Sequence, residues 1–187
     1  MNKCLSGGAS GADSIFGEEA KKAGHEVYHF HFNKNKQGLP HFYILGEEKL
    51  KVADPYLKWA NKTLNRGSFP YSNEYTNDML RRNFYQIKTA DSVYAITRLE
   101  KGNVKGGTGW ATQMFIDKHK GEACACYVYD MLTERWYIWM GPRWGFKDRY
   151  PGIGLEVDIP KPKGIYAGIG SRELTPKGEW ALRSLYL

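Results

Sequence analysis

The sequence predicts an α/β fold, a doubly wound and mostly parallel sheet with helices on both faces. Three stretches indicate this, because in each a short apolar strand runs into a glycine turn and then a helical pattern: 3–24, 92–119 and 164–187. The carboxyl ends of parallel strands share one edge of a sheet, so the three glycine turns are expected to converge on one crevice. In this class of fold, ligands bind at such crevices.

Length and composition favour one globular domain over residues 1–187, because 42% of the 187 residues are apolar and 25% are charged. The net charge of +7 suits an anionic partner, but the basic residues are spread along the chain. No apolar run approaches the ~20 residues that span a bilayer, and no signal-peptide pattern is present. We therefore expect a cytoplasmic protein with no membrane partner. Three cysteines indicate reduced thiols, and no metal site is predicted.

The first unit begins with the strand Lys3–Leu5, which leads into the glycine-rich stretch Ser6–Asp13. The helix that follows stops at Gly24. One apolar face carries Ala12, Ile15, Phe16, Ala20 and Ala23. Ser10 or Asp13 could cap this helix or bind a ribose or phosphate, and both interpretations remain open.

Residues Val27–Phe32 alternate with period two, which predicts a strand with His29 and His31 on one face. Two histidines without a third ligand at suitable spacing favour partly exposed side chains over a metal site. The polar segment 33–45 predicts a loop or lid.

Two helical regions follow. Glu47–Leu64 has a helical pattern in which Pro55 must begin a new helix or kink the first one. The next helix is predicted from Glu74 to Lys88 and carries Arg82 and Asn83 side by side. Such a pair is usually solvated, but an arginine's planar fork of donors also suits a phosphate.

The second unit contains the strand Ser92–Ile96, the glycine stretch Lys105–Trp110 and a helix over Ala111–His119. Glycines let backbone N–H groups approach a ligand, and a helix that starts there directs its positive dipole end at the same point. An anion is the expected occupant. A tight turn without a ligand is the alternative for a single glycine cluster, and the presence of three such units favours binding.

Ala123–Tyr129 predicts a further buried strand and Arg135–Met140 an antiparallel edge strand. The proline- and glycine-rich residues 141–162 then predict a surface excursion within about 130–163. The tryptophans of this region are Trp136, Trp139 and Trp144. Aromatic side chains in such a segment more often pin a loop to the core than stack on a base.

The third unit has a strand over Gly164–Gly170, the polar turn Ser171–Glu173 and a helix. Thr175 is a plausible N-cap, and Pro176 suits the first turn. The residues that we predict to bind the ligand at the shared edge are Ser6, Gly7, Gly8, Ser10, Gly11, Asp13, Arg82, Asn83, Gly106, Gly107, Thr108, Gly109, Trp110, Gly168, Gly170, Ser171 and Arg172.

Four motifs together resemble the SLOG superfamily of Rossmann-like proteins: Ser6–Asp13, Arg82–Asn83, Gly106–Gly109 and Gly168–Glu173. The superfamily includes LOG cytokinin-activating phosphoribohydrolases, the DNA-processing protein of transformation, and many phage and defence proteins. The resemblance leaves the 33–71 region and the tryptophan segment unaccounted for. It implies a SLOG-type Rossmann-like fold, of phage type, and the host cytoplasm as location if the chain is phage-encoded.

The order of the motifs departs from the family. The Gly-Ser-Arg-Glu strand usually precedes the Ser-Gly-Gly-Ala strand, whereas here it comes after it. The chain therefore looks circularly permuted, which would bring the end near Leu187 close to Met1. The competing explanation is that the C-terminal unit completes a neighbouring subunit's sheet, which would force a dimer. The resemblance by itself also leads us to expect a homodimer.

The catalytic motif departs as well. LOG-type enzymes carry Gly-Gly-x-Gly-Thr-x-x-Glu, and this chain has Trp110 at the threonine position and Gln113 at the glutamate position. A neutral amide cannot act as a general base, so the resemblance implies binding more than LOG-type hydrolysis. Arg82 falls near the family's catalytic arginine, and Glu173 or Asp13 could supply a replacement carboxylate.

The leading hypothesis is a sensor or sequestering protein that holds a nucleotide or nucleotide-derived ligand, such as an ADP-ribose-like signal, and needs no other cofactor. The first alternative is a nucleotide N-glycosidase or phosphoribohydrolase, with Arg82, Glu173 and Asp13 as catalytic candidates. The second alternative is a basic nucleic-acid-binding module, which only the net charge and the precedent of the DNA-processing relative favour.

Overall fold

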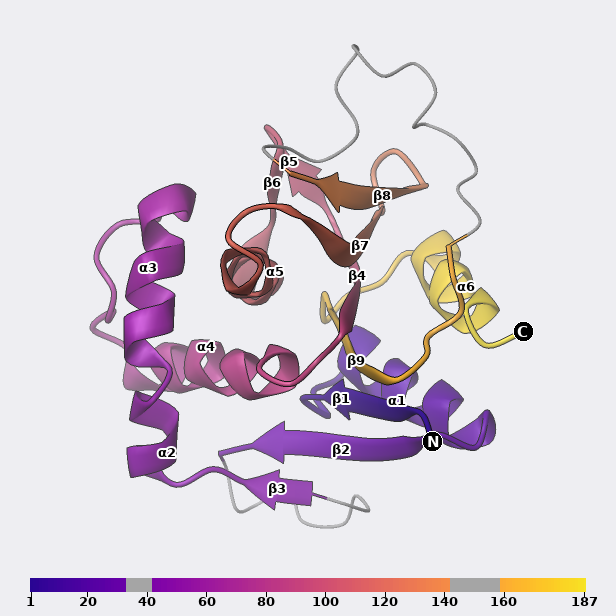
Figure 1. Ribbon diagram of the computed structural model, residues 1–187, viewed down its shortest axis with the longest axis horizontal. Coiled ribbons are helices and arrows are strands. Elements are labelled where there is room, and N and C mark those ends of the chain that lie inside the picture. Colours follow the sequence, from indigo (N-terminus) through magenta and orange to yellow (C-terminus); the bar gives the residue numbers. More distant parts are fainter. Residues whose placement is uncertain (33–41, 142–158) are drawn as a thin grey trace.

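The computed structural model describes residues 1–32, 42–141 and 159–187 (Figure 1). The strands of its main sheet are β1 (Lys3–Ser6), β2 (Glu26–His31), β3 (Phe42–Ile44), β4 (Ser92–Thr97), β7 (Ala123–Asp130), β8 (Arg135–Met140) and β9 (Ile165–Gly170). A separate hairpin is formed by β5 (Leu99–Glu100) and β6 (Asn103–Val104). The helices are α1 (Ala12–Lys22), α2 (Glu47–Lys51), α3 (Asp54–Leu64), α4 (Glu74–Ile87), α5 (Gly106–Lys118) and α6 (Pro176–Ser184).

The main sheet has the strand order β3-β2-β1-β9-β4-β7-β8. All neighbouring strands are parallel except β8, which runs antiparallel to β7 at one edge. β4 is buried at every position, as expected of a strand covered on both faces, and β2 alternates between buried and partly exposed positions. The predicted doubly wound, mostly parallel sheet is confirmed.

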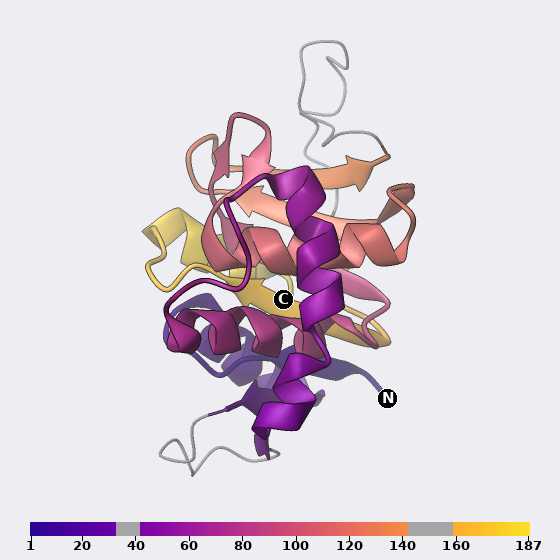
Figure 2. The same cartoon turned by 90° about the vertical axis from the view of Figure 1, so that its left-hand side faces the viewer.

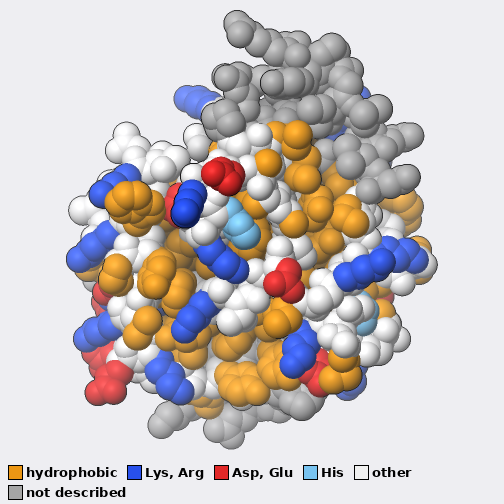
Figure 3. Space-filling model, viewed as in Figure 1, with side chains coloured by type: hydrophobic (Ala, Val, Ile, Leu, Met, Phe, Trp, Pro, Cys, Tyr) orange, Lys and Arg blue, Asp and Glu red, His pale blue; other side chains and the backbone are white. Residues whose placement is uncertain are grey.

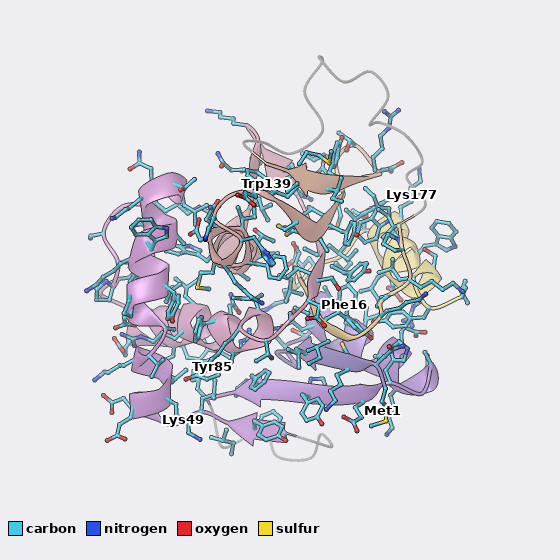
Figure 4. The ribbon with its side chains drawn as sticks, viewed as in Figure 1. Met1, Phe16, Lys49, Tyr85, Trp139 and Lys177 are labelled. Atoms are coloured by element: carbon cyan, nitrogen blue, oxygen red, sulfur yellow. The ribbon has the colours of Figure 1, made fainter. Side chains whose placement is uncertain are left out.

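Helices cover both faces of this sheet (Figure 1). On one face, α4 and α5 pack on β4 and its neighbours around a core that includes Phe115, Ile116 and Val93. On the other face, α1 and α6 pack together over Phe16, Tyr166 and Leu182. Figure 4 shows Phe16 in the interior, whereas Met1, Lys49 and Lys177 lie at the periphery.

The helices α2 and α3 form an outer layer. Figure 2 shows them in front of α4 and α5, on the side away from the sheet. Leu57 and Ala60 are the buried residues of α3, which packs mainly on α5. Pro55 lies in the first turn of α3, so it begins a new helix and does not kink α2.

Three expectations are corrected by the structure. The glycine stretch that begins at Gly106 is the first turn of α5 and not a loop before a helix at Ala111. Part of the expected loop at 33–45 is the edge strand β3, and the rest lies outside the described residues. His29 and His31, expected to be partly exposed, are each only 5% exposed because their face of β2 packs inward.

The strand β9 lies between β1 and β4 of its own chain, so the C-terminal unit completes the centre of this sheet and not that of a neighbour. The predicted N-cap of α6 is confirmed, since Thr175 Oγ1 accepts a hydrogen bond from the Gly178 N–H at 3.1 Å. The two ends of the chain meet at His25: Asn2 Nδ2 lies 3.1 Å from His25 Nε2, and the Tyr186 ring lies 5.9 Å from the His25 ring.

The predicted edge strand Arg135–Met140 is confirmed as β8. Trp139 pins β8 to the end of α5, because its Nε1 donates to the Gly121 carbonyl at 3.1 Å, and Trp136 packs edge-on against Tyr129. Trp144 and most of the expected excursion lie outside the described residues. Within the described ranges, none of the helices combines the length and the apolar character needed to cross a bilayer.

Candidate functional site

The three glycine turns converge, as predicted, on one cavity of about 340 Å³ at the carboxyl edge of the sheet, which we call the rim pocket. Five parts of the chain line it: the turn after β1 with the start of α1, the middle of α4, the end of β4, the start of α5 and the end of β9 with the turn after it. The lining residues are Ala9, Ser10, Asp13, Met79, Leu80, Arg82, Asn83, Gln86, Thr97, Lys105, Gly106, Gly107, Thr108, Ala111, Ile169, Gly170, Ser171 and Arg172.

The N-terminus of α5 supplies hydrogen-bond donors to the rim pocket. Its first helical hydrogen bond runs from the Gly109 N–H to the Lys105 carbonyl at 3.3 Å, so the preceding N–H groups of Gly106, Gly107 and Thr108 have no acceptor within the helix. No described side chain caps this end, and the first turn carries no acidic residue. The positive end of the helix dipole therefore meets the cavity uncompensated.

Gly106 and Gly107 have different reasons to be glycine. Gly106 has a φ of +62°, a left-handed conformation that favours glycine. At Gly107 an added Cβ would have its nearest neighbour, Asn83 Nδ2, at 3.7 Å, so the fold itself tolerates a side chain there. Asn83 donates to the Gly107 carbonyl at 3.1 Å and thereby fixes α4 to the start of α5.

A buried ion pair forms the floor of the rim pocket. Arg82 Nη1 donates to Asp13 Oδ2 at 3.0 Å, and both side chains are less than a tenth exposed. The other carboxylate oxygen of Asp13 accepts from the Gly170 N–H at 3.2 Å. Gly7 leaves room for the pair, because a Cβ there would lie 1.0 Å from Arg82 Nη1. The charge of Asp13 is thus already compensated within the protein.

Two cationic side chains line the rim pocket beside this pair. Lys105, the residue before α5, forms an ion pair with Glu100 at 2.7 Å, and both side chains are half-exposed. Arg172 follows β9, is exposed, and has no ion-pair partner within the described ranges. Ser171 is held nearby, since its hydroxyl lies 3.2 Å from Thr97 Oγ1. The cavity therefore has a positive wall and one neutralised carboxylate.

Ten of the predicted binding residues line the rim pocket: Ser10, Asp13, Arg82, Asn83, Gly106, Gly107, Thr108, Gly170, Ser171 and Arg172. The sequence reasoning missed several others, of which the most polar are Lys105, Thr97 and Gln86. The position of Lys105 immediately before the glycine stretch was a usable signal. Thr97 had a signal as well, because it directly follows the predicted strand Ser92–Ile96 and so lies at the carboxyl end of that strand. Gln86 had none, because only the packing of α4 against the sheet brings it to the edge.

The other predicted binding residues shape the site from outside it: Ser6, Gly7, Gly8, Gly11, Gly109, Trp110 and Gly168. Ser6 Oγ donates to the Asp13 carbonyl at 2.6 Å. Gly11, with φ +93°, packs so closely against the backbone of Arg172 that a Cβ would lie 2.1 Å from the Arg172 carbonyl oxygen. Gly109 likewise packs against the Val104 carbonyl, which a Cβ would approach to 2.2 Å. Gly8 has a φ of +59°, and Gly168 makes room for the Phe16 ring.

Trp110 is a core residue. It is 3% exposed and packs against the rings of Phe69 and Tyr71, with centroid distances of 5.8 and 6.3 Å. It lines a second cavity beside the rim pocket and not the rim pocket itself.

The third catalytic candidate, Glu173, lies beside the rim pocket, whereas Gln113, which replaces the LOG glutamate, lies away from it. Glu173 is exposed and lines a small neighbouring cavity with Arg98 and Arg172. Gln113, at the position of the LOG glutamate, donates to Asp117 at 2.8 Å and lines a cavity on another side of α5. Helix geometry explains this, because Gln113 lies two residues and about 200° beyond Ala111, which does face the rim pocket.

Burial shifts the pKa values of His29 and Cys4 in the direction that favours their uncharged forms. Burial lowers the pKa of His29, with opposing effects from Asp13 and Arg82. Burial also raises the pKa of the Cys4 thiol to about 12, which disfavours its reactive thiolate. The three cysteines are free, and the described residues contain no group of three or more acidic, histidine or cysteine side chains that could hold a metal ion.

The fold is similar to that of a solved structure from Syntrophus aciditrophicus SB described as a "Putative molybdenum carrier protein". The TM-score is 0.51, the sequence identity is 16%, and the alignment covers 99% of this chain and 92% of the other. This likeness shows a shared α/β fold. No protein-family model matches the sequence, and no curated protein matches it at a significant level.

Proposed function

We propose that this protein binds a small anionic, nucleotide-derived ligand in the rim pocket and acts as its sensor or sequestering protein. One observation carries the proposal: Gly106, Gly107 and Thr108, whose N–H groups have no hydrogen-bond acceptor among the described residues, line a cavity that Lys105 and Arg172 also line. Backbone donors at a helix N-terminus together with arginine form a common phosphate-binding arrangement. The four motifs that resemble the SLOG superfamily all lie in or directly beside this pocket, which supports SLOG-type membership as part of the proposal.

Binding is favoured over hydrolysis by the state of the one carboxylate in the pocket lining. Asp13 already accepts hydrogen bonds from Arg82 and from the Gly170 N–H. A general base needs a free lone pair within reach of the proton that it abstracts. Arg82, Gln86 and the Gly170 N–H together take three of the roughly four acceptor sites of this buried carboxylate, so it is poorly placed to abstract a proton from a ligand.

An inorganic oxyanion is a second candidate ligand. The donors of the rim pocket suit any tetrahedral oxyanion, and the similar structure is described as a molybdenum carrier. The nucleic-acid alternative has less support. On the face of the molecule that Figure 3 shows, lysine and arginine side chains are dispersed among apolar ones and do not form a continuous basic patch.

Isothermal titration calorimetry with AMP, ADP-ribose, pyrophosphate and molybdate tests the proposal. We expect at least one phosphate-bearing ligand to bind. Arg172→Ala should lower the affinity about tenfold or more, since a hydrogen bond to a charged group contributes ~1.5–3 kcal/mol. Gly107→Ala should fold normally yet bind more weakly, because its methyl group would stand between the ligand and the N–H groups.

Lys58→Ala is the matched control, because it removes one positive charge from an exposed position on α3 that does not line the rim pocket. Its affinity should equal that of the unmodified protein. If Lys58→Ala and Arg172→Ala lowered the affinity equally, the effect of Arg172→Ala would be explained by the loss of net charge alone. Tight binding of molybdate with none of the phosphate compounds would select the oxyanion candidate, and no binding of any of the four would refute the proposal.

A further inference from the structure

The rim pocket opens into a second cavity of about 690 Å³, which we call the aromatic lobe. The two cavities adjoin, because the same residues line both: Met79, Leu80, Lys105, Gly106, Gly107 and Arg172. A ligand whose anionic group lies at the start of α5 would therefore have space beside it for a further part. Both volumes lie in the range of ordinary ligand sites.

The aromatic lobe is built by parts of the chain other than the glycine turns. Its walls come from the loop before α4, which carries Tyr71, from the first turn of α4, which carries Tyr75 and Thr76, and from the β5–β6 hairpin. Trp110 of α5 contributes from the core. Three aromatic side chains thus surround a space that is continuous with a positive wall.

Hydrogen bonds hold this lobe in shape. The fully buried Asn77 accepts from the Tyr71 N–H at 2.8 Å and donates to the Tyr71 carbonyl at 2.9 Å. Tyr71 Oη donates to the Arg66 carbonyl at 3.0 Å, and Arg66 Nη1 donates to the Gly106 carbonyl at 2.6 Å. Arg66 Nη2 also donates to the Val104 carbonyl of the hairpin. The loop, the hairpin and the start of α5 are therefore fixed to one another, so a ligand would meet a preorganised surface.

Among the described aromatic side chains of the lobe, Tyr75 is the most exposed and so the most available for a new contact. It is 57% exposed, and its ring meets Phe32 edge-on with centroids 5.4 Å apart. Trp110 and Tyr71, in contrast, already pack on each other and on Phe69. An exposed, supported tyrosine ring beside an anion site favours stacking with a flat ring.

We infer that the ligand is a phosphate ester that carries a planar heterocycle, with the phosphate at the start of α5 and the ring in the aromatic lobe against Tyr75. This inference depends on the proposed function, since it assigns the second half of the same ligand. It excludes a bare oxyanion as the main ligand, because such an ion would leave the larger of the two cavities unused.

The test compares ribose 5-phosphate, which has the phosphate but no ring, with AMP, GMP, CMP and FMN by calorimetry. At least one ring-bearing compound should bind at least about tenfold more tightly than ribose 5-phosphate, as stacking on aromatic side chains would give. Tyr75→Ala should remove about tenfold of that advantage and leave the affinity for ribose 5-phosphate within about twofold. Tyr75→Phe should retain the advantage, since it keeps the ring.

Tyr43→Ala is the control, because Tyr43 is also an exposed tyrosine, on β3, but lines neither cavity. Equal affinities for ribose 5-phosphate and every ring-bearing compound would overturn this inference while leaving the proposed function intact. An unchanged affinity of Tyr75→Ala for the ring-bearing compounds would likewise overturn the inference and leave the proposed function intact. Failure of ribose 5-phosphate and of all the ring-bearing compounds to bind would instead refute the proposed function together with the inference.

Discussion

Arg82 and Asp13 join α4 to α1 beneath the rim pocket, although they lie 69 positions apart in the chain. Both side chains are almost completely buried, so each compensates a charge that water does not reach. Removing one partner of such a pair costs much more than the pair contributes, because the other charge is left buried alone.

Arg82→Met should therefore lower the free energy of unfolding by ~3–5 kcal/mol, measured by urea denaturation. Adding Asp13→Asn to this variant should recover part of the loss, because the unpaired charge is then removed. Lys22→Met is the control, since Lys22 pairs with Glu19 at the surface and should cost less than ~1 kcal/mol. If Arg82→Met and Lys22→Met lowered the free energy of unfolding equally, the Arg82–Asp13 pair would contribute no more to stability than a surface pair.

At this scale the sequence indicates which residues gather at the rim but not which of them pair. Asp13 and Arg82 are both predicted to contact the ligand, and the structure shows them as an ion pair in the lining of the rim pocket, in which Arg82 Nε is buried without a hydrogen-bond partner among the described residues. Trp110 is the other case, because a tryptophan after a glycine stretch is as consistent with a binding site as with the core. Such distinctions depend on distances between segments, which no local pattern contains.

At the scale of helices and strands, α1 lies against β9 because Gly168 has no side chain. An added Cβ would lie 2.4 Å from Phe16 Cγ, and Phe16 is fully buried. Gly168→Ala should thus lower the free energy of unfolding by ~1–3 kcal/mol through overpacking. Phe16→Leu should suppress part of this cost, because its smaller side chain gives the methyl group room. Urea denaturation measures the three variants. If the losses in the free energy of unfolding of the two single variants simply added up in the double variant, the contact between Gly168 and Phe16 would be contradicted.

Hydrophobic periodicity predicted most helices and strands, since the 3.6- and 2-residue periods are strong in α1, α4 and β2. Sequence patterns failed where the helix or strand propensity of a segment differs from the structure that the segment adopts in the fold. The three glycines of the stretch 106–109 have poor helix propensity, yet they form the first turn of α5. The edge strand β3 has only three residues, too few to show a period.

At the scale of the whole molecule, Asn2 and Tyr186 both lie beside His25, so the circular permutation, which stays a prediction, can be tested by joining the two ends. A chain that begins at Lys161, with Leu187 joined to Met1 by a short Gly/Ser linker, should fold with a loss of less than ~2 kcal/mol. A second chain, cut after Ala167 within β9 and carrying the same linker, is the control and should not fold. Circular dichroism and thermal melting measure both. An unfolded first chain would count against the permutation.

The strand order could not be predicted from the sequence, because it depends on pairings between distant segments. β9 pairs with β1 and with β4, at sequence separations that exceed any local pattern. The convergence of the three glycine turns was predictable, since it follows from parallel pairing alone and not from the order of the strands.

The central place of β9 has a consequence for the newly synthesised chain. The strands β1, β2 and β3 and the strands β4, β7 and β8 leave the ribosome before β9, and among the described strands only β9 pairs with both groups and joins them into one sheet. The facing sides of β1 and β4 are then open edges with unpaired N–H and C=O groups. Folding of the nascent chain therefore waits for β9, and a chaperone that shields strand edges would act in that interval.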